Sequence, residues 1–428
     1  MKNFELIKKE KIFNIGISEC YRNKRNNLKV ILLKNDIAPV VTFHIWYNVG
    51  SKDEENKRTG LAHFLEHMMF RGTSRYKVGE FDKILDEAGS RGSNAFTSTD
   101  YTAYTVDLPS DSIELIIKLE ADRMKNINIT KEILDIERGA ILSERALRVE
   151  NDPYGYMWEL LFSNLYKECE YNHDTIGWKK DIENITVKDL KDFYSQYYSP
   201  DNAEIVIVGD FNSENVLNLI EKHFSTIPRS NLNRKEDILE TYFPNNLILR
   251  KEFAISTPKL LLGYKTVSFK SMSFIALKLF SIILSEMNSS LFKEKFLSNN
   301  KVIYIVSDIL AMKNPGVFYI EADLKADENP QRILREIEFE ILNLVMNLNN
   351  EKLDLAKTKF KIDKLTSFSS NDSIATALGE SSVLTSSPYH DFELQKVVDN
   401  IKVDDIKKVV LEFLNLKKRV TIILEPKK

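Results

Sequence analysis

Apolar and polar positions divide the chain into strand-like and helix-like segments that follow the same order twice. Short apolar runs predict strands on both sides of Pro39 within residues 28–50, and on both sides of Pro258 within residues 247–267. Segments with apolar residues three or four positions apart predict helices at 110–126, 130–150, 335–350 and 351–368. This order predicts an α+β fold in which each half has a mainly antiparallel sheet with helices packed on one face.

The end of each half carries an ungapped internal repeat. ENITVKDLK at 183–191 aligns with DNIKVDDIK at 399–407. At the same spacing, AEIVIV at 203–208 aligns with RVTIIL at 419–424. A helix pattern followed by a strand pattern, repeated at a fixed distance, indicates a duplicated domain.

The boundary between the two copies is expected at a polar segment near the middle of the chain. Residues 228–238 (PRSNLNRKEDI) contain a proline and no apolar period, as is typical of a linker. We therefore predict two homologous domains, residues 1–227 and residues 239–428, joined by this linker.

Composition and charge exclude several kinds of protein. The formal net charge of −3 at pH 7 provides no basic surface for a nucleic acid. No apolar run approaches the roughly 20 residues needed to cross a bilayer, and the N-terminus lacks the apolar core of a secretory signal. Cys20 and Cys169 are the two cysteines, which excludes a disulfide framework and a thiolate-rich zinc cluster. We expect a cytoplasmic protein without a nucleic-acid or membrane partner.

The stretch TGLAHFLEHMMFRGT, which begins at Thr59, contains the candidate chemistry. His63 and His67 are four residues apart, so a helix places both imidazoles on one face, with Glu66 beside the second. Thr59 is the expected N-cap of this helix, and Gly72 is the glycine expected beyond its end. H-x-x-E-H is the inverted zincin motif. The alternative is a polar helix face without a metal.

A third ligand is needed, because a catalytic zinc ion takes three protein ligands and leaves a fourth position open. Glu137 and Glu144 are candidates, since both fall within a predicted apolar stripe of the 130–150 helix. The apolar members of that stripe are Ile133, Ile136, Ala140, Ile141 and Leu147. A carboxylate on a core-facing stripe requires a cation or a metal. The alternative is a pair of partly exposed glutamates that form ion pairs with nearby Arg or Lys.

Together these features resemble the pitrilysin and mitochondrial processing peptidase family of inverted zinc metallopeptidases. The resemblance rests on HFLEH at 63–67, GSNAFTSTDYTAY at 92–104, the glutamates at 137 and 144, and YYSPDNAEIVIVGDF at 197–211. It implies one Zn²⁺ per chain bound by His63, His67 and Glu144, with Glu66 as general base and Glu137 as an auxiliary carboxylate. It also implies a zinc-dependent endopeptidase that hydrolyses short or unfolded peptides.

The resemblance also implies where a substrate binds. The segment 94–108 is rich in Thr, Tyr and β-branched residues and is expected to form a strand. In the family this strand pairs with an extended peptide through residues that match Asn94 and Ala95. Pairing through backbone groups selects extended chains more than particular sequences.

The second half departs from the family pattern, which has an Arg and a Tyr that complete the site. MNSSLFKEKFLSNNKVIYIV at 287–306 keeps Tyr304, predicted to bind substrate. Leu297 stands where the Arg is expected and Lys301 where a Gly is expected. Lys295 is the alternative cation after a shift of two residues, but a lysine is a point donor and lacks the guanidinium fork.

This departure predicts that a second chain completes the site. We expect a homologous, zinc-free subunit in a heterodimer, with a homodimer as the alternative. The alternative function is a catalytically weak structural or peptide-binding subunit of a family assembly. The presence of His63, Glu66, His67 and Glu144 together favours the peptidase.

Overall fold

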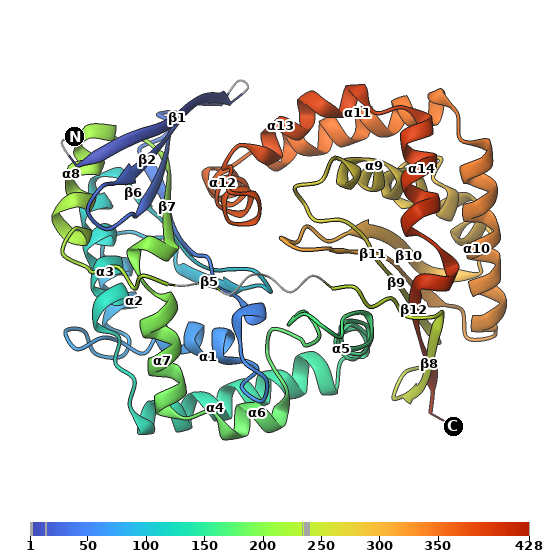
Figure 1. Ribbon diagram of the computed structural model, residues 1–428, viewed down its shortest axis with the longest axis horizontal. Helices are drawn as coiled ribbons and strands as arrows, with labels where there is room; N and C mark the ends of the chain where they lie inside the picture. The colour runs from blue at the N-terminus through green and yellow to red at the C-terminus, as the bar shows by residue number, and fades with distance from the viewer. Residues whose placement is uncertain (1–2, 13–14, 233, 235–239, 428) are drawn as a thin grey trace. The chain divides into compact units, whose positions relative to one another are not determined.

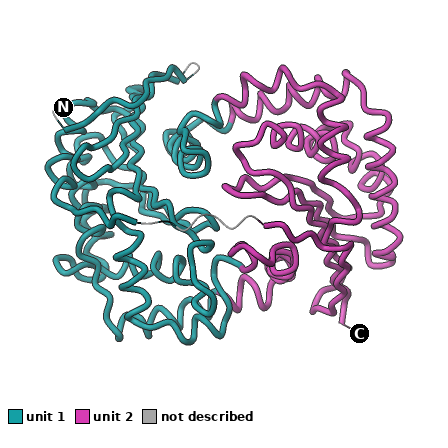
Figure 2. Tube along the Cα trace, in the orientation of Figure 1, with its two compact units in different colours: residues 1–144, 174–236, 367–392 teal, residues 145–173, 237–366, 393–428 magenta. Residues whose placement is uncertain are grey.

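The computed structural model describes residues 3–12, 15–232, 234 and 240–427 (Figure 1). These residues form two compact units, each built around one sheet (Figure 2). Unit 1 comprises residues 1–144, 174–236 and 367–392, and unit 2 comprises residues 145–173, 237–366 and 393–428. The predicted domains 1–227 and 239–428 follow the internal repeat and stay a prediction. Positions 233 and 235–238 of the predicted linker lie outside the described residues.

The sheet of unit 1 has seven strands in the order β1-β2-β3-β7-β4-β6-β5. They are β1 (Phe4–Ile12), β2 (Gly16–Asn23), β3 (Lys29–Lys34), β4 (Val40–Tyr47), β5 (Ser93–Thr97), β6 (Thr102–Pro109) and β7 (Ala203–Gly209). Strands β3 and β7 are parallel, and all other neighbours are antiparallel. Every residue of β7 is buried, which explains the apolar run at 205–208.

The helices of unit 1 come from three parts of the chain. They are α1 (Leu61–Met69), α2 (Glu80–Glu87), α3 (Ile113–Asn126), α4 (Lys131–Arg145), α6 (Lys179–Asn184), α7 (Val187–Tyr197), α8 (Ser213–Phe224) and α12 (Asn371–Thr385). The last residue of α4, Arg145, already belongs to unit 2, where a π-helical turn (Ala146–Glu150) continues the helix.

The sheet of unit 2 has five strands in the order β10-β11-β9-β12-β8. They are β8 (Leu247–Phe253), β9 (Lys259–Lys265), β10 (Val302–Ile309), β11 (Val317–Leu324) and β12 (Arg419–Pro426). The helices are α5 (Pro153–Leu165), α9 (Met272–Ser281), α10 (Pro330–Asn347), α11 (Asn350–Ser367) and α14 (Val403–Phe413), while α13 (His390–Val397) continues from unit 1 into unit 2.

Both sheets repeat one strand plan. In unit 1, β3 is parallel to β7, and β4, β6 and β5 follow in antiparallel pairs. In unit 2, β8 is parallel to β12, and β9, β11 and β10 follow in the same way. The predicted α+β class, with two similar and mainly antiparallel sheets, is confirmed. The predicted strand at 94–108 is instead a hairpin of β5 and β6, because residues 98–101 turn the chain.

Each sheet also packs against a helix that lies beyond its own half of the sequence. Helix α12 contacts β4 and β7 in unit 1, and α5 contacts β9 and β12 in unit 2. Trp46 of β4 faces α12, whereas the adjacent Tyr47 stacks on Tyr198 just beyond α7. Because successive strand residues point to opposite faces, α12 covers the face that the unit's other helices leave open.

At the contacts of α12 with β4 and of α5 with β9, a glycine on one element packs against a large side chain on the other. Gly379 of α12 lies against Trp46, since an added Cβ would be 2.1 Å from the indole. Gly263 of β9 lies against Leu161 of α5, since an added Cβ would be 2.4 Å from that side chain. The helix supplies the glycine in one unit and the strand supplies it in the other.

Gly379→Ala is therefore expected to lower the free energy of unfolding by about 1–3 kcal/mol, because the new methyl group collides with a buried ring. Gly139→Ala is the matched control, since Gly139 lies within α4 and an added Cβ meets nothing within 4 Å. That substitution should raise stability by roughly 0.5–1 kcal/mol through helix propensity. Urea denaturation measures both, and shifts of equal sign would contradict the packing.

No helix among the described residues is both long enough and apolar enough to span a membrane.

Candidate metal centre

Helix α1 carries His63, Glu66 and His67, and a buried glutamate fixes its first turn. Glu54 accepts hydrogen bonds from the backbone N–H groups of Gly60 and Ala62, both at 2.7 Å. Burial raises the pKa of the Glu54 carboxyl well above its usual range, although these two N–H groups oppose the shift. The start of α1 is therefore set by a side chain six residues upstream of Gly60.

The predicted N-cap, Thr59, does not cap this helix. Its hydroxyl donates to Asp181 Oδ2 at 2.7 Å and accepts from the backbone N–H of Trp178 at 2.8 Å. The N-cap is Gly60, whose φ of 90° is left-handed. Gly72 does lie beyond the helix end with a left-handed φ of 85°, and a Cβ there would be 2.5 Å from the carbonyl oxygen of Tyr76.

The structure brings His63, His67 and Glu144 together. The Glu144 Oε2 atom lies 3.3 Å from His67 Nε2 and 3.7 Å from His63 Nε2. The two imidazole centroids are 4.7 Å apart. Among the residues that the structure describes, these three form the one group of His, Cys, Asp or Glu ligands whose donor atoms all lie within 4.8 Å of one another.

This donor set fits zinc. Two imidazole nitrogens and one carboxylate oxygen are the ligands of many catalytic zinc sites. Ligand atoms bonded at 2.0–2.1 Å in a tetrahedron lie roughly 3.4 Å apart. The two distances from Glu144 to the histidines bracket that separation. Zinc would need little rearrangement of these side chains.

Glu137 lies on the other side of the His67 ring. Its Oε2 atom is 3.4 Å from His67 Nδ1, and its Oε1 atom is 2.6 Å from Arg71 Nε. The side chain is 1% exposed. A carboxylate at one ring nitrogen holds the proton there and leaves the other nitrogen available as a ligand. Glu137 is thus placed to orient His67.

The buried face of α4 and of the π-helical turn that continues it differs from the predicted stripe. Ile136 and Leu147 are 67% and 71% exposed. The buried positions are Leu134, Glu137, Ile141, Arg145 and Val149. The sequence prediction was therefore wrong for Ile136, Ala140 and Leu147, all of which are exposed. Glu144 is partly buried beside this face.

Carboxylates surround the two histidines. Burial of the His67 ring lowers its pKa, but Glu144, Glu66 and Glu137 outweigh burial and the net result is a raised pKa. Three carboxylates beside two imidazoles create a field that favours a bound cation.

Glu66 is held by the edge strand of the sheet. The hydroxyl of Thr97, the last residue of β5, donates to Glu66 Oε2. Among the described strands, β5 has one neighbour, β6, and its other side is the edge of the sheet. No local pattern singles out Thr97, because one threonine in a β-rich segment is most simply a strand former.

The predicted substrate residues of unit 1 lie on the same strand. Asn94 is exposed, and its side-chain oxygen accepts a hydrogen bond from the Ala95 N–H at 2.9 Å. Asn94 and Ala95 pair with Thr105 and Tyr104 of β6. They therefore belong to the strand whose outer side is unpaired in the described sheet and whose last residue contacts Glu66.

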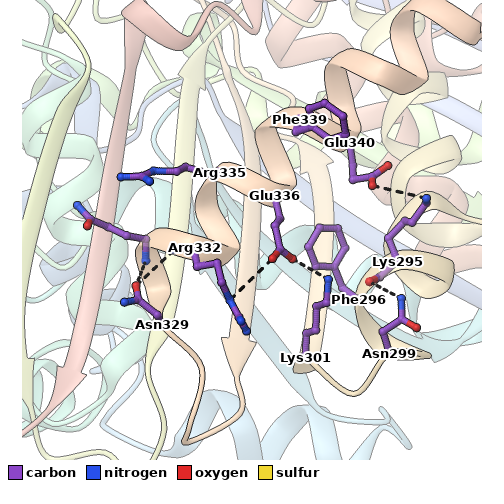
Figure 3. Close-up of a pocket in the computed structure, with 11 residues that line it drawn as sticks. Lys295, Phe296, Asn299, Lys301, Asn329, Arg332, Arg335, Glu336, Phe339 and Glu340 are labelled. Carbon is purple, nitrogen blue, oxygen red and sulfur yellow. Dashed lines mark hydrogen bonds and ion pairs between the residues drawn. The ribbon is translucent and has the colours of Figure 1, made fainter.

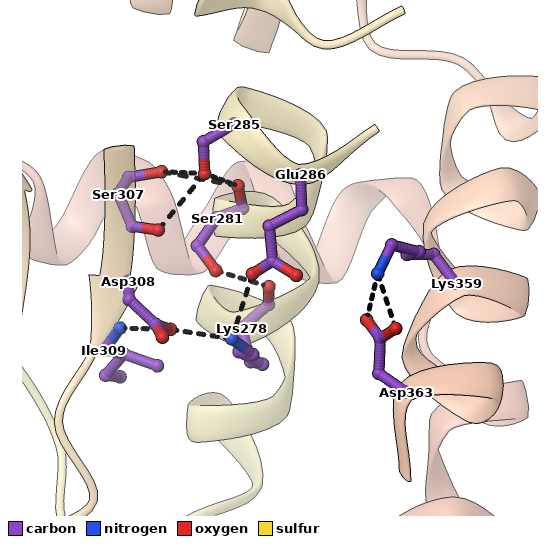
Figure 4. Close-up of polar contacts among 9 residues, drawn as sticks. All are labelled: Lys278, Ser281, Ser285, Glu286, Ser307, Asp308, Ile309, Lys359 and Asp363. Atoms are coloured by element: carbon purple, nitrogen blue, oxygen red, sulfur yellow. Dashed lines mark hydrogen bonds and ion pairs between the residues drawn. The ribbon is translucent and has the colours of Figure 1, made fainter. Parts of the chain in front are cut away.

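Tyr304 lies on β10, the edge strand of unit 2, and is 44% exposed. The Nζ atom of Lys278 in α9 donates a hydrogen bond to Asp308 Oδ1 of this strand at 2.8 Å (Figure 4). Leu297 is 38% exposed. Lys295, the alternative cation of the sequence, has its Nζ 3.5 Å from Glu340 Oε1 of α10.

Two family models match the chain. The model of insulinase, peptidase family M16, matches residues 29–177. The model of the peptidase M16 inactive domain matches residues 184–360. The first range contains His63, Glu66, His67 and Glu144, whereas the second contains none of the four.

Similar proteins include named proteases. The chain is 29% identical to zinc protease PqqE of Helicobacter pylori over 414 residues, which cover 94% of this chain and 91% of that protein. It is 24% identical to mitochondrial-processing peptidase subunit beta of Lentinula edodes, over 94% of this chain and 88% of that protein. The crystal structure of a protease from Helicobacter pylori matches with a TM-score of 0.86 at 28% identity, covering 96% of this chain and 99% of that chain.

Proposed function

The chain belongs to the M16 family of peptidases, and we propose that it is a zinc-dependent endopeptidase that cleaves short or unfolded peptides. The observation that carries the proposal is the convergence of His63, His67 and Glu144 within 4.8 Å, with Glu66 on the same helix. A degenerate structural subunit has no chemical need for all four side chains. We therefore favour catalysis over a purely structural or peptide-binding role.

In this proposal His63, His67 and Glu144 hold one zinc ion. Bound there, zinc would supply a lowered pKa for a coordinated water and a polarised peptide carbonyl. Glu66 takes a proton from the attacking water and gives it to the leaving amine. Glu137 keeps the His67 ring in the tautomer that presents Nε2 to the site.

Thr97 is expected to hold Glu66 in position for that proton transfer. Thr97→Val removes the hydroxyl that donates to Glu66 but keeps the side-chain shape. We expect kcat to fall about 10- to 100-fold with little change in KM, since a hydrogen bond to a charged group contributes roughly 1.5–3 kcal/mol.

Thr97→Ser is the matched control, because it keeps the hydroxyl and should retain most of kcat. Steady-state kinetics on one peptide substrate, together with melting temperatures, measure both variants. Equal losses in the two variants would assign Thr97 to strand packing and not to Glu66.

The proposed substrate is an extended chain that adds to the open edge of β5. A disordered peptide should be cleaved, whereas the same sequence inside a stably folded domain should resist, because folded chains cannot present a free strand. Mass spectrometry of both digests by the zinc-loaded protein tests the function. Equal cleavage of both forms would reject selection by strand addition, and cleavage of neither would reject the peptidase proposal for the chain alone.

We further propose that a second chain contributes to the active assembly. Leu297 stands where the family pattern has an arginine. One relative is named as the beta subunit of a processing peptidase, which supports a homologous partner in a heterodimer. A homodimer is the alternative, and a cytoplasmic location stays a prediction.

A further inference from the structure

A cavity of about 530 Å³ lies in unit 2 between α10 and the segment that leads from the π-helical turn Lys293–Leu297 to β10 (Figure 3). Its volume is within the range of small-molecule sites. None of the candidate metal ligands lines it. The cavity is therefore separate from the centre described above.

Its lining carries an excess of positive charge. Two cations come from the segment before β10 and two from the first turns of α10, and they are Lys295, Lys301, Arg332 and Arg335. The two carboxylates of the lining are Glu336 and Glu340. Glu328, which precedes α10, forms a further ion pair with Arg332. The four cations and the three carboxylates therefore leave one positive charge, which an anion complements.

Three of the four cations have a carboxylate partner: Lys295 pairs with Glu340, Lys301 with Glu336, and Arg332 with both Glu328 and Glu336. Glu336 Oε2 lies 2.7 Å from Lys301 Nζ, and Glu336 Oε1 lies 3.8 Å from Arg332 Nε. Figure 3 shows Glu336 directed toward both cations. Arg335 forms no ion pair with any residue that the structure describes, and it is exposed. An exposed guanidinium without an ion-pair partner can bind a phosphate through two parallel N–H groups.

Two further side chains of the lining indicate which other chemical groups the ligand carries. Glu340 Oε1 pairs with Lys295, whereas Oε2 is buried and accepts no hydrogen bond from a described residue, so a turn of this carboxylate toward the cavity would let Oε2 accept one from a ligand hydroxyl. The ring of Phe339 is 67% exposed beside the cavity and offers an apolar face. The lining therefore combines an anion site, a hydroxyl acceptor and an aromatic surface.

We propose that this cavity binds a phosphorylated sugar, either free or as part of a nucleotide. The phosphate pairs with Arg335 and the neighbouring cations, and a sugar hydroxyl donates to Glu340. Phe339 contacts the base when the ligand is a nucleotide.

Isothermal titration calorimetry of the full chain tests this, with metal removed by a chelator so that phosphate cannot bind at the metal centre. The probes are AMP, ribose 5-phosphate and adenosine. AMP and ribose 5-phosphate should bind and adenosine should not. Tighter binding of AMP assigns a nucleotide, and equal binding assigns a free sugar phosphate. Absence of binding by both phosphates, or equal binding of adenosine, overturns the proposal.

Variants locate the binding. Arg335→Gln and Glu340→Gln should each weaken binding of ribose 5-phosphate about tenfold or more. Lys408→Gln, an exposed position of α14 outside the cavity, makes the same charge change as Arg335→Gln and should leave the affinity unchanged. Equal weakening by Lys408→Gln and Arg335→Gln would mean nonspecific attraction and overturn the site.

Discussion

Glu66→Gln is expected to stop peptide hydrolysis while leaving the metal in place. Glutamine keeps the size of the side chain and its hydrogen bond to Thr97, but it cannot accept the proton of the attacking water. A positioned general base contributes about 10²–10⁴ to the rate, so kcat should fall by that factor. Hydrolysis of a quenched-fluorescence peptide by the purified, zinc-loaded variant measures the loss.

Zinc analysis of the same variant is the control. The metal content should equal that of the unmodified chain, because Glu66 is not among the three converging ligands. A Glu66→Gln protein with full metal and undiminished turnover would remove Glu66 from the role of base. If the unmodified zinc-loaded chain does not hydrolyse the peptide either, the missing part of the site would be placed on a second chain.

Glu144→Ala should abolish stoichiometric zinc binding. The substitution removes the oxygen that lies 3.3 Å and 3.7 Å from the two histidine nitrogens, which leaves two ligands where a stable site needs three. Elemental analysis after dialysis against a weak chelator should find one zinc per unmodified chain and close to none in the variant.

Glu137→Gln tests the carboxylate that supports a ligand without removing any of the ligands. This variant keeps all three proposed ligands and changes the partner of His67 Nδ1, so zinc affinity should fall about 10–100-fold without being lost. Glu132→Ala, at an exposed position of the same helix, should not change the zinc content.

For the ligand itself, retention of full zinc by the Glu144→Ala variant would exclude Glu144 as a ligand.

Local sequence patterns predicted the parts of the site that lie on one element. His63 and His67 could be paired from their spacing, because four residues make about one helical turn. The predicted stripe made both Glu137 and Glu144 candidates, but only the resemblance to a family chose Glu144 as the ligand, since nothing local tells which distant glutamate approaches the histidines. Thr97 and Glu54 could not be found, because each acts through a tertiary hydrogen bond.

The apolar pattern predicted both sheets and the long helices, but not how two of the helices pack. The sequence of α4 and of the π-helical turn after it places Ile136 and Leu147 among apolar neighbours, yet the packed face is rotated toward Glu137. Helix α12 packs on the sheet of unit 1 although its sequence lies in the second half. Periodicity describes which side of a helix is apolar and contains no information on which sheet covers it.

Anomalous diffraction from a crystal of the zinc-loaded chain, recorded on both sides of the zinc absorption edge, tests whether one zinc ion is bound by His63, His67 and Glu144. We expect one strong peak per chain, within bonding distance of the Nε2 atoms of both histidines and of the Glu144 carboxylate. A zinc-loaded crystal with its peak elsewhere, or with Glu144 turned away from the metal, would contradict this expectation.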